Sequence, residues 1–232
     1  MNITLMLTCL CDALYGEVGI ATVKVLEYVG CEIQFLERQT CCGQPPFNSG
    51  DWKESKRVAE QWLKVFSESN GPIVTPSASC AAMVRHGFSM LSIPRVSRKV
   101  FELSEFLYDE LRIRAWPGLT NRQVAAYHRA CHGRMLGLAD QQRELLRMIG
   151  NLEIVEINNP EQCCGFGGAF SITHGSISAG IGMEKLESFR SAQVETFITG
   201  DMGCAMHLDG LARHYGMNIS SKHFVQLLAE AL

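Results

Sequence analysis

Short apolar runs alternate with amphipathic segments along both halves of the chain. Residues 3–8 and 124–127 are apolar runs bounded by turn-forming residues, which favours short buried strands. Residues 31–35 alternate apolar and polar positions, a pattern typical of a half-buried strand. Two further apolar runs, residues 73–75 and 197–199, predict strands that lead into Cys80 and Cys204.

A helix is predicted in the first half, before the strand at residues 73–75. Asp51, with Glu54 three residues later, can cap its N-terminus. Val58, Trp62 and Phe66 then recur at helical spacing, and the segment 70–72 (Asn-Gly-Pro) ends the pattern. Alternating strands and helices predict an α/β fold with parallel sheets, in which ligands bind beyond the carboxyl ends of the strands.

The cysteines follow the same spacing in both halves of the chain. The first cysteine precedes a Cys-Cys-Gly triplet by 32 residues in each half (Cys9 to Cys41, Cys131 to Cys163). The second cysteine of the triplet precedes the last by 38 or 40 residues (Cys42 to Cys80, Cys164 to Cys204). This register predicts an internal duplication with two pseudo-symmetric lobes, residues 1–111 and 123–232. Residues 112–122, where Pro117-Gly118 interrupts any regular pattern, are the expected linker.

Composition narrows the class of protein. The chain has 232 residues, of which 47% are hydrophobic and 19% charged, as in an ordinary soluble globular protein. Its net charge of −3 argues against nucleic acid or an anionic membrane as a partner. No apolar run approaches the ~18 residues that suggest a membrane span. Residues 3–11 resemble a signal-peptide core, but they lack a preceding Lys or Arg and a following cleavage site. We therefore expect a cytoplasmic protein, whose thiols stay reduced.

In such a protein, the ten cysteines indicate metal or redox chemistry. Iron–sulfur clusters are usually held by four thiolates. Each half offers four aligned cysteines: Cys9, Cys41, Cys42 and Cys80, then Cys131, Cys163, Cys164 and Cys204. The glycine after each vicinal pair permits the turn that lets neighbouring cysteines serve one site. Backbone N–H groups of residues 44–49 and 166–171 are expected to hydrogen-bond the sulfurs.

Other interpretations stay open for these residues. Zinc can occupy a four-cysteine site, although the paired C-x2-4-C knuckles of structural zinc sites are absent. A vicinal pair can also form a redox disulfide. Cys11 and Cys31 are expected to be core residues. His128, His132, Arg129 and Arg134 lie near Cys131, where they can donate hydrogen bonds, bind the carboxylate of a 2-hydroxy acid, or simply occupy a solvated loop.

The segments TCLCDALY, QTCCGQPPFNSG, PSASCAAM, YHRACH, QCCGFGGAFS and GDMGCAM together resemble the duplicated cysteine-rich CCG domain, above all in the lactate-utilisation protein A family. The resemblance implies two Rossmann-like lobes and an iron–sulfur electron-transfer subunit of a system that oxidises L-lactate to pyruvate. It implies a [4Fe-4S] cluster, one or two per chain, with a ferredoxin-like iron–sulfur protein and a third small protein as partners. Such a subunit is expected to be an oxidoreductase component that is inactive by itself.

The chain departs from the fuller motif of a more distant relative, the cysteine-rich subunit of heterodisulfide reductase. That motif ends in C-x-x-C, and five cysteines hold a non-cubane cluster. Here Ser77 and Asp201 stand where the first cysteine of each closing C-x-x-C belongs. Asp201 can supply an oxygen ligand, Ser77 less readily, or one lobe can have lost its cluster. Two other functions remain: a cluster-dependent thiol–disulfide reductase and a non-redox assembly subunit.

Overall fold

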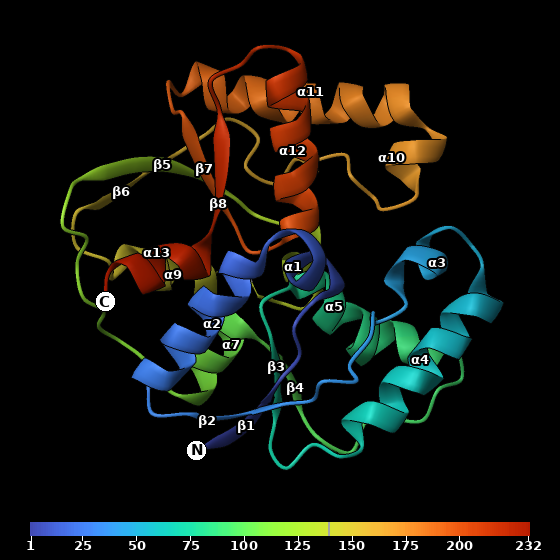
Figure 1. The fold of residues 1–232 in the computed structure, drawn as a ribbon. Coiled ribbons are helices and arrows are strands. Elements are labelled where there is room, and N and C mark those ends of the chain that lie inside the picture. Colours follow the sequence, from blue (N-terminus) through green and yellow to red (C-terminus); the bar gives the residue numbers. More distant parts are fainter. Residues whose placement is uncertain (139) are drawn as a thin grey trace.

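Two parallel sheets, one from each half of the chain, form the framework of the molecule (Figure 1). The computed structural model describes residues 1–138 and 140–232. The sheet orders are β2-β1-β3-β4 and β6-β5-β7-β8, and every pairing is parallel. The strands are β1 (Asn2–Leu5), β2 (Glu32–Phe35), β3 (Ile73–Thr75), β4 (Val100–Glu102), β5 (Gln123–His128), β6 (Leu152–Val155), β7 (Thr196–Thr199) and β8 (Ser220–His223). The matching orders confirm the predicted α/β class and the duplication.

Helices connect consecutive strands in both lobes. In the first lobe they are α1 (Cys9–Leu14), α2 (Gly16–Tyr28), α3 (Gln44–Asn48), α4 (Trp52–Phe66), α5 (Ala78–Ala82), α6 (Phe88–Met90) and α7 (Leu103–Glu105), with π-helical turns η1 (Met83–Gly87) and η2 (Phe106–Glu110). In the second lobe they are α8 (Cys131–Met135), α9 (Gln141–Arg147), α10 (Phe170–Thr173), α11 (Gly175–Ser191), α12 (Met202–His214) and α13 (Phe224–Glu230). Within the described residues, no helix combines the length with the apolar character that crossing a bilayer requires.

Local signals explain where two of these helices begin. The Asp51 carboxylate accepts a hydrogen bond from the backbone N–H of Glu54 at 3.1 Å, so the predicted cap of α4 is confirmed. The N-terminal strand is shorter than predicted, because β1 ends at Leu5 and the hydroxyl of Thr8 caps α1 by accepting from the N–H of Cys11 at 3.1 Å. Thr8 therefore starts the helix that carries Cys9.

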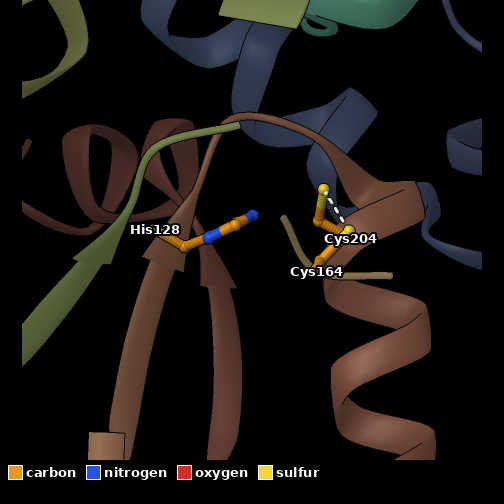
Figure 2. Close-up of side chains that lie close together, drawn as sticks. All are labelled: His128, Cys164 and Cys204. Carbon is orange, nitrogen blue, oxygen red and sulfur yellow. Dashed lines mark hydrogen bonds between the residues drawn. The ribbon is translucent and has the colours of Figure 1, made fainter. Parts of the chain in front are cut away.

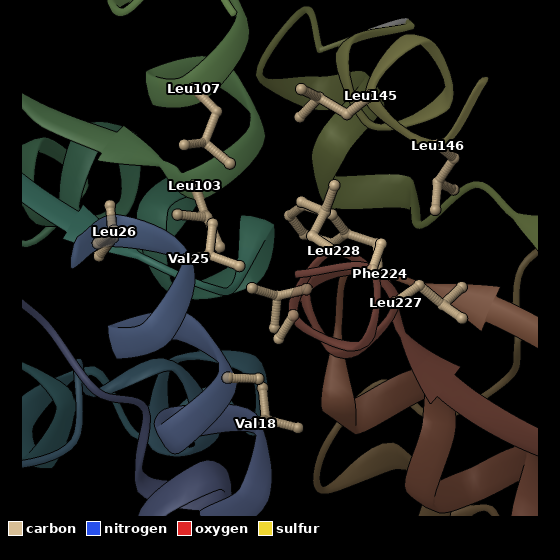
Figure 3. Close-up of a cluster of buried hydrophobic side chains, with 14 of the residues drawn as sticks. Val18, Val25, Leu26, Leu103, Leu107, Leu145, Leu146, Phe224, Leu227 and Leu228 are labelled. Atoms are coloured by element: carbon tan, nitrogen blue, oxygen red, sulfur yellow. The ribbon is translucent and has the colours of Figure 1, made fainter. Parts of the chain in front are cut away.

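The largest hydrophobic core lies between the two sheets (Figure 3). Helices α2 and α7 contribute to it from the first lobe, and α9 and α13 contribute from the second. Separate, smaller cores lie under α4 in the first lobe and under α11 and α12 in the second. The lobes thus share their main core, and the lobe boundaries 1–111 and 123–232 stay a prediction.

The linker lacks regular secondary structure but is anchored to both lobes. The indole N–H of Trp116 donates to the carbonyl of Leu228 in α13 at 2.9 Å. The same ring packs edge-on against Tyr28 of α2, with 5.3 Å between ring centroids. Trp116 of the linker therefore contacts a helix of each lobe.

Candidate metal centre

The eight aligned cysteines line one cavity of about 660 Å³ between the lobes. In each lobe one cysteine follows the first strand of the lobe, the vicinal pair follows the second, and the last follows the third. These positions lie beyond the carboxyl ends of parallel strands, as predicted. Cys11 and Cys31 lie instead in the shared core, again as predicted.

Within each lobe the sulfurs form close pairs. In the first lobe the Sγ atoms of Cys9 and Cys41 are 3.6 Å apart, and those of Cys42 and Cys80 are also 3.6 Å apart. In the second lobe the Sγ atoms of Cys164 and Cys204 are 3.0 Å apart. Two thiolates on one tetrahedral metal atom, at metal–sulfur distances of ~2.3 Å, lie about 3.8 Å apart. The two first-lobe pairs are therefore close to the spacing that a shared metal atom requires, whereas the second-lobe pair is closer together than that.

The turn after each vicinal pair depends on glycine. Gly43 and Gly165 have φ of 86° and 89°, in the left-handed region that glycine tolerates. A Cβ added to Gly43 would lie 3.0 Å from the carbonyl oxygen of Ser55, and one on Gly165 would lie 2.5 Å from that of Ser178. Each turn thus lies against the second helix after it, α4 for Gly43 and α11 for Gly165.

The same two serines fasten the turns. The buried Ser55 hydroxyl donates to the carbonyl of Gly43 at 2.9 Å, and the buried Ser178 hydroxyl donates to that of Gly165 at 2.8 Å. Each glycine N–H in turn donates to the first sulfur of its pair, Cys41 at 3.5 Å or Cys163 at 3.3 Å. These two hydrogen bonds to sulfur come from Gly43 and Gly165, one residue before the segments 44–49 and 166–171 where such donors were expected. Sequence reasoning missed these serines. They follow their glycines by 12 and 13 residues, and this similar spacing in the two halves was the one signal in the sequence.

The thiols of each lobe differ in acidity. The first cysteine of each pair has a pKa well below the ordinary value, because it accepts hydrogen bonds from neighbouring thiols (Cys42 and Cys9 for Cys41; Cys131 and Cys164 for Cys163). Those four donors have raised pKa values, mainly because of the same hydrogen bonds and burial. Each lobe thus stabilises one thiolate between protonated thiols, so metal binding must displace protons.

Ser77 and Asp201 cap matching helices and meet across the lobe boundary. The Ser77 hydroxyl accepts from the N–H of Cys80 at 3.2 Å, and the Asp201 carboxylate accepts from the N–H of Gly203 at 3.2 Å. The other carboxylate oxygen of Asp201 accepts from the Ser77 hydroxyl at 3.3 Å and from the N–H of Ser79 at 3.0 Å. Both residues line the cavity, and both oxygens of Asp201 are engaged in hydrogen bonds.

The basic residues near Cys131 divide into two groups. Arg129 and Arg134 both pair with Glu161, at 2.6 and 3.0 Å. His132 lines the cavity; its Nδ1 lies 3.7 Å from the sulfur of Cys131, and its Nε2 lies 3.1 Å from the amide nitrogen of Gln44 in the other lobe. The arginines therefore sit in a surface ion-pair network, whereas His132 bridges the lobes.

Two further polar side chains are buried beside the second-lobe thiols. His128, at the end of β5, has a pKa lowered to about 3 by burial and by the nearby Lys185. Lys185, in α11, has a pKa lowered to about 8 by burial, and its ammonium donates to the carbonyls of Asn159 and Pro160 at 3.1 Å each. Sequence reasoning missed Lys185, which lies on the buried face of α11.

The donor set fits a polynuclear iron–sulfur cluster better than a single zinc ion. Among the described residues, the only trio of Cys, His, Asp or Glu ligand atoms within 4.8 Å of one another is His128, Cys164 and Cys204. The four thiols of each lobe are thus spread too widely for one ion, whose ligands lie ~2.3 Å from the metal. Four soft thiolates with backbone N–H donors are the typical environment of an iron–sulfur cluster.

Comparisons with known proteins agree with this geometry. The cysteine-rich domain family CCG matches residues 3–85 and 125–209. Lactate utilization protein A of Geobacillus kaustophilus (strain HTA426) is 39% identical over 237 residues, covering 98% of each chain. Lactate utilization protein A 2 of Bacillus cereus (strain Q1) is 35% identical, covering 100% of this chain and 99% of that relative.

Among solved structures, a hypothetical protein from Helicobacter pylori is similar over 100% of this chain, with a TM-score of 0.58 and 10% sequence identity. This chain spans 49% of that protein, and at such low identity the likeness shows the fold alone. The family match and the full-length relatives go further. Because two cysteine-rich segments match the CCG family and the identity to these relatives extends over nearly the whole length, the chain belongs to the lactate utilization protein A family and has two copies of the CCG domain.

Proposed function

We propose that this protein takes part in lactate utilisation as an iron–sulfur electron-transfer subunit. The observation that carries the proposal is the convergence of eight thiols, four from each CCG copy, on one cavity between the lobes. The names of the full-length relatives supply the metabolic role. The proposed ligands of one or two [4Fe-4S] clusters are Cys9, Cys41, Cys42, Cys80, Cys131, Cys163, Cys164 and Cys204.

Such a cluster accepts and donates single electrons when bound. The chain's own groups would hold it and adjust its charge. Cys41 and Cys163 supply the thiolates that are already favoured, and the N–H groups of Gly43 and Gly165 donate to those sulfurs. The chain carries no nicotinamide or flavin fingerprint, so a hydride acceptor must come from elsewhere. We therefore propose that it works with a ferredoxin-like iron–sulfur protein and a third small protein, and that alone it does not oxidise lactate.

The first test is the metal content of the chain. Protein purified without oxygen is expected to be brown and to contain iron with matching acid-labile sulfide. The Cys164→Ser and Cys42→Ser variants should each lose iron, because each removes a buried thiol from one lobe. The Cys31→Ala variant is the matched control, since Cys31 lies in the shared core away from the cavity. Colourless protein with stoichiometric zinc, after expression with iron supplied, would refute the cluster.

The same measurement decides the place of Asp201. We predict that Asp201 is an additional oxygen ligand, but coordination through the oxygen facing Ser77 would replace the hydrogen bonds from Ser77 and Ser79. The Asp201→Asn variant keeps the size of the side chain and removes its charge. Loss of iron from this variant is expected for a ligand, and full iron content would limit Asp201 to capping α12 and joining the lobes.

The second test is growth. Deletion of the gene is expected to abolish growth on L-lactate in a host with no other lactate dehydrogenase, and the Cys163→Ser variant should fail to restore it. The variant must accumulate and bind its partners for the result to count. A stable Cys163→Ser protein that restores growth would leave that lobe only a scaffolding role, and normal growth of the deletion strain would remove the lactate role.

The cavity also supports a second candidate function. Its volume of about 660 Å³ is that of a small-molecule site, and thiols from both lobes face it. A cluster-dependent thiol–disulfide reductase would place its disulfide there. Oxidation of the reduced protein by a small disulfide, at a rate above that of the apoprotein, would favour this function over electron transfer between proteins. A protein that holds no cluster at all would leave the non-redox assembly role.

A further inference from the structure

The second lobe has polar groups where the first lobe has apolar ones. When the two halves are aligned on their cysteines, His128 falls opposite Met6, three residues before the first cysteine. When they are aligned on Ser55 and Ser178, Lys185 falls opposite Trp62. Met6 and Trp62 are both buried in the apolar cluster that contains Cys42 and Cys80. The duplication therefore produced two thiol sites with different surroundings.

His128 points at the second-lobe thiol pair (Figure 2). Its ligand nitrogen and the sulfurs of Cys164 and Cys204 all lie within 4.8 Å of one another. The residue is 1% exposed, and neither ring nitrogen has a hydrogen-bond partner among the described residues. A buried polar group without a partner destabilises a fold by roughly 1–3 kcal/mol. An imidazole in this position needs a partner, and the described residues supply none.

Lys185 of α11 lies near His128 and also favours a metal at this site. Lys185 is fully buried, with its ammonium on the carbonyls of Asn159 and Pro160, and it lies near enough to influence both His128 and the thiols of Cys164 and Cys204. A buried cation beside two thiols stabilises their anionic, metal-binding form. Imidazole binds metals through a ring nitrogen in its neutral form, and thiols bind them as thiolates.

We propose that His128 is a nitrogen ligand of the metal centre that Cys164 and Cys204 bind, which gives the second-lobe site a nitrogen ligand that the first-lobe site lacks. With metal–nitrogen and metal–sulfur distances of ~2.1 and ~2.3 Å, the nitrogen and a sulfur bound to the same metal atom would lie about 3.6 Å apart. The ring therefore has to approach such a sulfur by at most about 1.2 Å, because the ligand atoms lie within 4.8 Å of one another. Where the metal is the iron of a cluster, the inference rests on the proposed function.

The two sites should also differ in reduction potential. Net charge around an iron–sulfur centre helps to set its potential, and a nearby positive charge makes reduction easier. The buried ammonium of Lys185 supplies such a charge in the second lobe, and Trp62 supplies none in the first. The second-lobe site is therefore the one that is reduced first.

Pulsed electron paramagnetic resonance of the reduced, anaerobically reconstituted full chain tests the ligand. Protein labelled with 15N-histidine should show a strong nitrogen coupling that changes with the isotope. The coupling should vanish in His128→Met, which copies the first lobe, and persist in the control His132→Gln. A labelled wild-type cluster without isotope-dependent coupling, or one whose coupling vanishes with His132, would overturn the proposal.

Two further arms keep the test decisive. The reverse variant Met6→His should add a second histidine coupling in the first lobe. This variant tests the proposal even if His128→Met fails to fold. Titration of the metal-free full chain with Co²⁺ separates the inference from the proposed function. If no cluster forms, wild type should still give a Co²⁺ spectrum of mixed nitrogen and sulfur ligands that becomes all-sulfur in His128→Met. Identical Co²⁺ spectra would refute His128 as a ligand.

Discussion

At the scale of single residues, each lobe has a buried titratable side chain at the end of its fourth strand. Glu102 at the end of β4 caps α7, and His223 at the end of β8 caps α13. Each also reaches the other lobe: Glu102 accepts from the Gln142 amide at 3.2 Å, and the Nε2 of His223 lies 3.1 Å from the carbonyl of Pro76. Burial raises the pKa of Glu102 to about 7 and lowers that of His223 to about 4. Glu102 is therefore neutral between pH 4.5 and about 7, where an exposed glutamate is charged. His223 is neutral between about pH 4 and 6.5, where an exposed histidine is charged.

Glu102 gives a prediction with a definite sign. Its pKa rises from 4.5 to about 7 on folding, so the folded state binds the proton more tightly than the unfolded state. Its contribution to stability is complete below pH 4.5 and is lost as the pH rises through 7, by about 3 kcal/mol in all. The Glu102→Gln variant should gain stability relative to wild type between pH 5 and pH 8.

Denaturant titrations of both proteins at the two pH values measure this gain. Glu32→Gln, at an exposed glutamate of β2, is the matched control for the substitution itself. Parallel stability profiles of wild type and Glu102→Gln would show that the carboxyl is not the group that titrates.

At the scale of elements, the Cys-Cys-Gly turns depend on their contact with α4 in the first lobe and α11 in the second. The Gly165→Ala variant should be strongly destabilised, because a left-handed backbone costs a residue with a Cβ roughly 1–2 kcal/mol, and the added Cβ would lie 2.5 Å from the Ser178 carbonyl oxygen. Gly180 is the control, because it is exposed in α11 and an added Cβ would have nothing within 4 Å. Gly180→Ala should stabilise the helix by up to ~1 kcal/mol.

The melting temperature and the metal content of Gly165→Ala and Gly180→Ala are measured and compared with those of the wild type. Gly165→Ala should also bind less metal, since the turn orients Cys163 and Cys164. Equal melting temperatures of Gly165→Ala and wild type would show that the turn can move away from α11 without loss.

The sequence predicted the elements better than it predicted the contacts between them. The spacing of Cys9, the vicinal pair and Cys80 was enough to anticipate two similar lobes with thiols at the carboxyl ends of strands. The contact of Ser55 with Gly43 was not predictable, because it joins residues on different elements and depends on how α4 packs. The orientation of His128 toward Cys164 was hidden for the same reason: periodicity predicts β5 but not what lies beyond its end.

At the scale of the whole molecule, the cavity has walls that belong to different lobes and are held in place by buried contacts. Asp201 of the second lobe accepts hydrogen bonds from Ser77 and Ser79 of the first. Helix α2 packs against α13 in the shared core, where Val25 and Phe224 are both fully buried (Figure 3). The arrangement of the two thiol sets is thus a property of the intact chain and not of either lobe.

This sharing predicts that neither lobe folds by itself. Separation would expose the apolar faces of α2 and α7 on one fragment and of α9 and α13 on the other. Each large apolar side chain so exposed forfeits roughly 1.5–3 kcal/mol, and a domain has only ~5–15 kcal/mol of stability in total. Residues 1–111 and residues 112–232, expressed separately, should aggregate or lack near-ultraviolet circular dichroism. The two fragments expressed together should associate, because Trp116 and α13 can still pack against Tyr28 and α2. Full chain cleaved once within residues 112–122 is the control and should remain one particle on size-exclusion chromatography. A fragment 1–111 that is monomeric and unfolds cooperatively would show that the first lobe is stable without the shared core, and that the duplicated halves are joined only to bring their thiols together.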